Sequence, residues 1–128
     1  MIVDTSAIIA IVFREPGFEA LVERLAAASG LAAGAPTLAE TSIVLSARLK
    51  RDARGLLERM LQEFRIESVP FSDEHWRAAH DAYLRYGKGR HPARLNFGDC
   101  LSYATAKLAD QPLLFTGGDF GKTDIAVA

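Results

Sequence analysis

The sequence predicts an α/β protein in which helices cover both faces of a central parallel sheet, a three-layer α/β/α arrangement. Short apolar runs alternate with segments of helical periodicity along the whole chain, and the runs at 1–3 and 113–115 are apolar at every position. Strands that are apolar throughout are typical of parallel sheets, because both of their faces are buried. Alternating strands and helices favour the same class of fold.

Length and composition are those of one globular domain. The chain has 128 residues, of which 49% are hydrophobic and 24% are charged, and no repeat, linker or low-complexity segment divides it. A chain of this size can bury a substantial core. We therefore expect a single domain over residues 1–128.

The first half of the chain supplies two of the expected strands. A strand at 1–3 leads into residues 7–13, which are apolar nearly all round and so predict a core helix. An amphipathic helix follows over 18–29, and the small residues at 31–34 indicate a second strand. Pro36 then opens the next helix.

The second half continues the alternation. A helix over 52–64 precedes a strand over 66–71, and Ser72 caps the next helix, which has acidic residues in its first turn. A short edge strand at 125–127 ends the chain. We expect the helix after Ser72 to bury a stripe formed by Trp76, Ala79, His80 and Tyr83.

The stretch from Asn96 to Asp119 combines a helix, a strand and a turn. Asn96 can cap the helix, and Asp99 falls at about its third position. Pro112 ends the helix because it cannot continue it, and the buried strand at 113–115 follows. The turn after this strand carries Asp119 past its carboxyl end, where open α/β sheets bind their ligands.

Four acidic residues are expected at this edge of the sheet. Asp4 and Asp119 follow strands directly. Glu40 and Asp99 lie in the first turns of helices that begin on the same side. Each acid also has a structural interpretation, since Asp4 can cap a helix and Glu40 can form a capping box with Thr37. Apolar residues three, four and seven positions after Glu40 place it on the core-directed face of its helix.

The four acids together predict a metal site. Four carboxylates in one cleft cannot all stay ionised unless a positive group lies among them. A divalent cation meets this requirement, and Mg²⁺ uses one or two carboxylates, several waters and a substrate phosphate. Such a site can activate a water and orient a phosphodiester. The candidate residues are Asp4, Glu40, Asp99 and Asp119.

A basic loop leads into this site. Positive residues cluster between Gly87 and Arg94 without an intervening acid, although the formal net charge of the chain is −1. A polyanion would therefore be held by local patches rather than by the field of the whole protein. The expected contacts to a nucleic-acid backbone are Lys88, Arg90, His91 and Lys122.

Cysteine content and the distribution of apolar residues bear on the cellular compartment. Cys100 is the only cysteine, so no intramolecular disulfide can form. No run of 18 or more apolar residues is present, and the first residues lack the basic segment of a signal peptide. We expect no membrane association and a cytoplasmic location.

The motifs together resemble a known family. The opening Ile-Val-Asp-Thr-Ser at 2–6, Glu40 at the start of a helix, Asn-Phe-Gly-Asp-Cys at 96–100 and Leu-Leu-Phe-Thr-Gly-Gly-Asp-Phe at 113–120 resemble the pattern of PIN-domain ribonucleases. More narrowly, the chain resembles the VapC toxins of bacterial toxin–antitoxin pairs. The similarity covers the whole chain.

The resemblance implies a PIN-like fold and a Mg²⁺- or Mn²⁺-dependent endoribonuclease that cleaves tRNA or another structured RNA and so inhibits translation. Asp4 and Asp99 match the principal metal positions, assisted by Asp119. Glu40 would position or deprotonate the attacking water. The positions that commonly support the cluster match Thr5, Ser6 and Asn96.

The resemblance also implies partners, and it leaves two questions open. The family forms homodimers and pairs with a VapB-type antitoxin whose tail covers the active-site groove. Asp124 lies five residues after Asp119 and could take the place of the fourth acid. The alternative function is a non-catalytic RNA- or protein-binding module in which the acids serve only as helix caps. A haloacid-dehalogenase-like phosphatase is disfavoured, because Ser6 stands where it would need a second aspartate.

Overall fold

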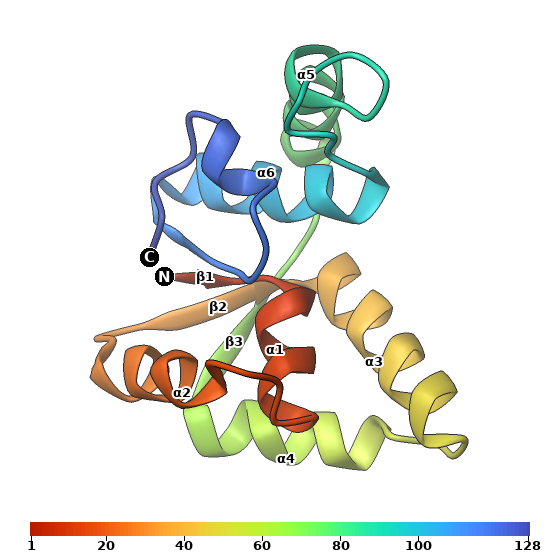
Figure 1. Cartoon of the computed structure of the whole chain (residues 1–128), viewed down its shortest axis with the longest axis vertical. Coiled ribbons are helices and arrows are strands. Elements are labelled where there is room, and N and C mark those ends of the chain that lie inside the picture. The colour runs from red at the N-terminus through yellow and green to blue at the C-terminus, as the bar shows by residue number, and fades with distance from the viewer.

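A computed structural model describes all 128 residues and contains one parallel sheet with the strand order β3-β2-β1-β4 (Figure 1). Ile2 of β1 pairs with Ala32 of β2 on one side and with Leu113 of β4 on the other, while β2 pairs with β3 along its whole length. The expected parallel sheet is therefore confirmed. The strands are β1 (Ile2–Val3), β2 (Leu31–Gly34), β3 (Ile66–Val69) and β4 (Leu113–Leu114).

Helices cover both faces of the sheet, as the sequence predicts. Helices α1 to α4 lie on one face, whereas α5, α6 and the carboxyl-terminal segment lie on the other (Figure 1). None of the helices is long and apolar enough to cross a membrane. The bounds are α1 (Thr5–Val12), α2 (Phe18–Ala27), α3 (Ala35–Leu49), α4 (Arg54–Phe64), α5 (Asp73–Tyr86), α6 (Phe97–Ala109) and the 3₁₀ helix η1 (Phe120–Lys122).

Two separate cores explain why the central strands are apolar at every position. Val3 and Leu114 pack into the core beneath α1 to α4, together with Ile8 and Leu45. Their strand neighbours, among them Leu113, face the second core beneath α5 and α6. Burying an aliphatic side chain of this size contributes about 1.5–3 kcal/mol, so the alternation ties the short strands to both layers.

The expected buried stripe of α5 is wrong at three of its four positions. Trp76 and Tyr83 are 52% and 44% exposed, and His80 is also exposed. Of the expected residues only Ala79 is buried, and it shares the inner face with Ala82 and Tyr86. The small alanines allow α5 to approach α6 closely, which large rings would prevent. The exposed rings are covered instead by arginines, with Arg77 over Trp76 and Arg90 over Tyr83 at 4.9 and 5.7 Å.

Helix α3 begins within one residue of the predicted Pro36, but the capping box that Thr37 and Glu40 could form is absent. The helix begins at Ala35 with Gly34 as its N-cap, so Thr37 is not a capping residue and forms no capping box with Glu40. The inner face of α3 consists of Thr37, Thr41 and Leu45, whereas Ile43, three residues after Glu40, is 68% exposed. Glu40 therefore lies beside the core-directed face rather than at its centre.

The carboxyl terminus departs from expectation in one respect. The edge strand expected at 125–127 is reduced to a single bridge between Leu113 and Val127. Phe120 is 3% exposed, and its ring lies 5.0 Å from the ring of Phe115. This buried ring anchors the turn that follows β4, and with it the neighbouring Asp119.

Candidate active site

Asp4 stands where β1 ends and α1 begins. Its Oδ2 accepts hydrogen bonds from the backbone N–H of Ser6 at 3.0 Å and from the Ser6 hydroxyl at 2.6 Å. Its Oδ1 accepts one from the hydroxyl of Ser102 at 2.5 Å. The side chain is therefore the N-cap of α1, as its type suggested, but it is also 4% exposed and held by three donors. A carboxylate has about four lone-pair positions, so one remains free, on Oδ1.

Glu40 lies in the second turn of α3 and caps no helix. Its Oε1 accepts a hydrogen bond from the Thr5 hydroxyl at 2.7 Å. Its other oxygen, Oε2, lies against the backbone of Gly98 in the first turn of α6, where a Cβ atom would overlap the carboxylate. The absence of a side chain at Gly98 is therefore what lets Glu40 reach the N-terminus of α6.

Asp99 is the third residue of α6 and Asn96 caps this helix, as the sequence predicts, and Asp99 also completes a capping box. The Asn96 side chain accepts from the Asp99 N–H at 2.9 Å, and Asp99 Oδ2 accepts from the Asn96 N–H at 3.0 Å. Desolvation is the main cause that raises the pKa of Asp99 to about 6; the Asn96 hydrogen bond opposes this shift, and the charges of Asp4, Asp119 and Glu40 add to it. Asp4, Glu40 and Asp119 therefore all lie within electrostatic reach of Asp99.

No positive side chain compensates these four acids. Every ion pair of the chain uses a different acid: Glu15, Asp52 or Asp124. No three Asp, Glu, His or Cys side chains lie close enough to hold one ion between them. The free oxygens of Asp4, Glu40 and Asp99 nevertheless suit Mg²⁺, which needs only one or two carboxylates and keeps several waters. The donor chemistry and the uncompensated charge therefore fit a hard divalent cation.

Asp119 and Asp124 have different environments. Asp119 is exposed at the start of η1, makes no side-chain cap, and acts on Asp99 through its charge. Asp124 accepts from Tyr103 at 2.5 Å and from Lys107 at 2.9 Å. Against the desolvation from burial, these hydrogen bonds lower the pKa of Asp124 to about 2. Asp119 therefore belongs to the electrostatic cluster, while Asp124 is engaged elsewhere.

The basic residues expected to contact RNA are arranged unequally. Lys88 and Lys122 are exposed, and neither takes part in an ion pair. Arg90 is exposed but donates to the Leu84 carbonyl at 3.2 Å. His91 is half-buried, and its Nδ1 accepts from the backbone of Ala93 at 3.0 Å. Its ring meets that of Tyr86 edge-on, so His91 also stabilises the loop itself.

Sequence reasoning missed three buried hydroxyl residues around the acids: Thr37, Thr41 and Ser102. Ser102 follows Asp99 by three residues on α6 and so lies on the same side of that helix. Helical spacing from the acids could have found it. Its contact with Asp4, 98 residues away, is visible only in the folded chain.

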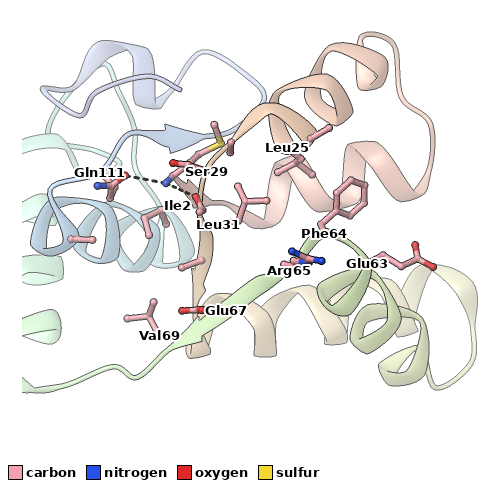
Figure 2. Close-up of a pocket in the computed structure, with 16 residues that line it drawn as sticks. Ile2, Leu25, Ser29, Leu31, Glu63, Phe64, Arg65, Glu67, Val69 and Gln111 are labelled. Atoms are coloured by element: carbon pink, nitrogen blue, oxygen red, sulfur yellow. Dashed lines mark hydrogen bonds between the residues drawn. The ribbon is translucent and has the colours of Figure 1, made fainter.

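A large hollow of the surface lies away from the acids. It has a volume of about 900 Å³ and opens at the amino edge of the sheet, between the ends of α2, α4 and α6 (Figure 2). Leu25, Leu31 and Phe64 line it, with Glu63 and Arg65 at its margin. Most of its lining is apolar, and none of the four candidate acids contributes to it. The hollow therefore does not mark the candidate active site.

The PIN domain family matches residues 1–126 of the chain. The chain belongs to the PIN-domain family. Ribonuclease VapC36 of Mycobacterium tuberculosis is 51% identical over 126 residues, which cover 98% of this chain and 91% of the relative. Ribonuclease VapC42 of the same species is 42% identical over 129 residues, covering 100% and 98%. The chain is accordingly a VapC-type ribonuclease.

Solved structures show the same fold at low sequence identity. The structure described as Mycobacterium tuberculosis VapC20, a Sarcin-Ricin loop cleaving toxin, superposes with a TM-score of 0.78 at 17% identity and covers 99% of this chain and 97% of that one. A toxin–antitoxin complex from Klebsiella pneumoniae gives 0.72 at 19% identity, with 99% and 95% covered. These likenesses confirm the α/β architecture.

Proposed function

We propose that the carboxylate cluster hydrolyses phosphodiester bonds of a structured RNA, such as a tRNA, with Mg²⁺ or Mn²⁺ as cofactor, and thereby inhibits translation in the cytoplasm. The observation that carries the proposal is the grouping of Asp99 with three other carboxylates that no basic residue compensates, where burial and the neighbouring charges raise the pKa of Asp99. Perturbed carboxyl groups gathered in this way are typical of functional sites.

Asp4 and Asp99 would hold the cation. Asp4 offers its remaining Oδ1 lone pair, and Asp99 offers an Oδ1 that makes no hydrogen bond within the chain. Asp119 would assist, directly or through a water. A divalent cation bound there would lower the pKa of a nearby water and neutralise charge on the phosphodiester. The hydrogen bonds to Asp4 and Asp99 would keep both carboxylates oriented.

Glu40 would act on the attacking water. Thr5 fixes Oε1, so Oε2 is the oxygen that can orient the water and accept its proton. Gly98 keeps the space beside Oε2 free of any side chain. The assignment separates the roles: Asp4 and Asp99 bind, whereas Glu40 handles the proton.

The RNA backbone would be held outside the acidic cluster. Lys88, Arg90 and Lys122 are exposed, and phosphate contacts by such residues position a nucleic acid without reading its sequence. His91 would support this grip mainly by keeping the loop in shape. Binding should weaken as salt concentration rises, because each phosphate contact releases counterions.

Two protein partners complete the proposal. A VapB-type antitoxin would cover the groove over the acids and suppress cleavage, in keeping with the toxin–antitoxin complex that shares this fold. A second copy would form a homodimer. Large apolar side chains left exposed on α3, α5 and α6 provide surface for such association, and they include Ile43, Trp76 and Phe97.

The test is cleavage of total tRNA by the wild-type chain and by Asp99→Asn, with Mg²⁺, with Mn²⁺ and with EDTA. Discrete fragments that vanish with the chelator and with the substitution would support the proposal. Cleavage that persists in EDTA would contradict it. The alternative of acids acting only as caps has lost its basis at two positions, since neither Glu40 nor Asp119 caps a helix through its side chain.

A further inference from the structure

Behind the carboxylates lies a set of buried hydroxyl groups that the fold alone does not require. Thr41 is fully buried, Ser102 is 1% exposed and Thr37 is 2% exposed. They come from α3 and α6, two helices that pack on opposite faces of the sheet and meet beyond its carboxyl edge (Figure 1). Burying a hydroxyl is costly unless it finds a partner, and every buried side-chain polar atom here has one.

One branch of these hydroxyls ends on Asp4. Ser102 gives its single proton to Oδ1 of Asp4 at 2.5 Å. The Ser102 oxygen lies 3.3 Å from the Thr37 hydroxyl, which therefore donates to it. On the other side of the carboxylate, the Ser6 hydroxyl donates to Oδ2 and accepts from the Thr116 N–H at 3.1 Å. Asp4 is thus fixed from α3, α6 and the segment after β4 at once.

The other branch ends on Glu40. Thr5 gives its proton to Glu40 Oε1 at 2.7 Å. The hydroxyl of Thr41 lies 2.9 Å from that of Thr5 and 2.8 Å from the Thr37 carbonyl. Each hydroxyl has one proton. Thr5 donates its proton to the Glu40 carboxylate, so Thr41 donates either to the Thr37 carbonyl or to the Thr5 hydroxyl. Thr37 therefore joins the branches, through its hydroxyl to Asp4 and through its carbonyl to Glu40.

We propose that Thr37, Thr41 and Ser102 are positioning residues that set the separation and orientation of the Asp4 and Glu40 carboxylates. This inference rests on the proposed function, because it assigns these hydroxyls to the same site. Ser102 and Thr5 donate directly to the two acids, and Thr37 and Thr41 hold these donors in place from behind. Residues that orient metal-binding side chains in this way affect affinity or activity about 10- to 100-fold.

Two substitutions at Thr41 separate the effect of its hydroxyl from that of its methyl group. Thr41→Val keeps the shape and removes the hydroxyl, whereas Thr41→Ser keeps the hydroxyl and removes the methyl group. We expect Thr41→Val to lower kcat about 10-fold or more with little change in KM, since it loosens Glu40 through Thr5 without touching the RNA-binding loop. Thr41→Ser should keep kcat within about threefold while lowering the melting temperature, because only packing is lost.

Ser102 has a matched control one turn away on the same helix. Thr105 is also 1% exposed, but its hydroxyl donates only to the Leu101 carbonyl of its own helix, at 3.0 Å. After removal of bound metal, titration calorimetry with Mn²⁺ should show about 10-fold or greater weakening for Ser102→Ala. Thr105→Val should bind Mn²⁺ as the wild type does. In an Asp4→Asn background, Ser102→Ala should have no further effect, because it acts through that carboxylate.

The outcomes separate this inference from the function on which it rests. A wild-type chain that neither binds Mn²⁺ nor cleaves RNA would overturn the proposed function. A wild-type chain that does both, with Ser102→Ala and Thr41→Val behaving like Thr105→Val, would overturn only the positioning role. A loss of kcat in Thr41→Ser as large as that in Thr41→Val would overturn the positioning role as well. Melting temperatures of all variants identify any loss that comes from unfolding.

Discussion

Two acids near opposite ends of helix α6 have opposite electrostatic surroundings. At its amino end, Asp99 lies among three other carboxylates without a cation, and burial together with their charge raises its pKa to about 6. Near its carboxyl end, Asp124 meets Tyr103, Lys107 and Arg85, and its pKa falls to about 2 despite burial. Asp124 has basic partners and so stabilises the fold, whereas Asp99 has none and so stays available to bind a cation.

The largest expected effect on RNA cleavage comes from neutralising, in separate variants, the acid near each end of α6. Asp99→Asn should lower RNA cleavage on the order of 10³-fold, while the melting temperature of the metal-free chain stays the same or rises because a repulsive charge is lost. Asp124→Asn should retain cleavage within about 10-fold, as expected for a group that holds neither cation nor RNA. Cleavage assays with thermal melts in EDTA measure both quantities. A fall in the melting temperature of Asp99→Asn would instead assign that acid to capping.

A smaller loss of activity should follow when the acids stay but their spacing changes. Gly98→Ala places a Cβ atom against the Glu40 carboxylate and must displace it or α6. Displacing a catalytic group by about 1 Å can cost on the order of 10²-fold in kcat. Gly121→Ala is the control, since a Cβ there meets no neighbouring atom. Equal kcat values for the two variants would show that the close approach of Glu40 and Gly98 does not matter for cleavage.

The hydrogen bonds of Asp124 near the carboxyl end of α6 should contribute more to folding stability than Asp99 does. Asp124→Asn gives up charge-assisted hydrogen bonds to Tyr103 and Lys107, and partial exposure reduces their worth to about 1 kcal/mol. For a chain of this length that is a fall of about 3–6 °C in melting temperature. Glu23→Gln, at an exposed acid outside any ion pair, should change it by less than about 1 °C. If Glu23→Gln lowered the melting temperature as much as Asp124→Asn does, the contacts of Asp124 with Tyr103 and Lys107 would contribute nothing specific to stability.

The smallest effect is a pH dependence of opposite sign at the two ends. Because the folded-state pKa of Asp99 is raised, the metal-free folded chain binds more protons than the unfolded chain, and stability falls as pH rises from about 4 to about 6. Because the pKa of Asp124 is lowered, its contribution is present above about 4 and is lost as pH falls toward 2. Melting curves in EDTA should show the first slope only when Asp99 is present, with Asp99→Asn as the control.

Much of the architecture could be predicted because its causes are local or periodic. Asn96 and Asp99 form their capping box within a single helical turn, and the apolar runs around Val3 and Leu114 reveal strands buried on both faces. The common location of the four acids could also be predicted, since residues near the carboxyl ends of parallel strands share one edge of the sheet, although Glu40 lies in the second turn of its helix rather than in the first.

Where several local patterns were equally plausible, sequence reasoning failed. Helix α5 offers two apolar faces, and the close approach of α6 selects the face with Ala79 and Ala82 over the one with Trp76. The pair Thr37 and Glu40 has the spacing of a capping box, yet α3 begins two residues earlier and Thr37 turns inward. Packing between elements overrode the local preference in both cases.

The sequence by itself determined the order of strands and helices, the two-sided burial of the sheet and the edge on which the acids gather, because these follow from hydrophobic period and from caps a few residues long. Only the tertiary structure decided which donor meets which acid. Thr5 reaches Glu40 across 35 residues and Ser102 reaches Asp4 across 98, while Lys107 takes Asp124 away from the cluster that Asp119 joins. Hydrogen bonds act over about 3 Å, so such pairings exist only once distant segments have packed together.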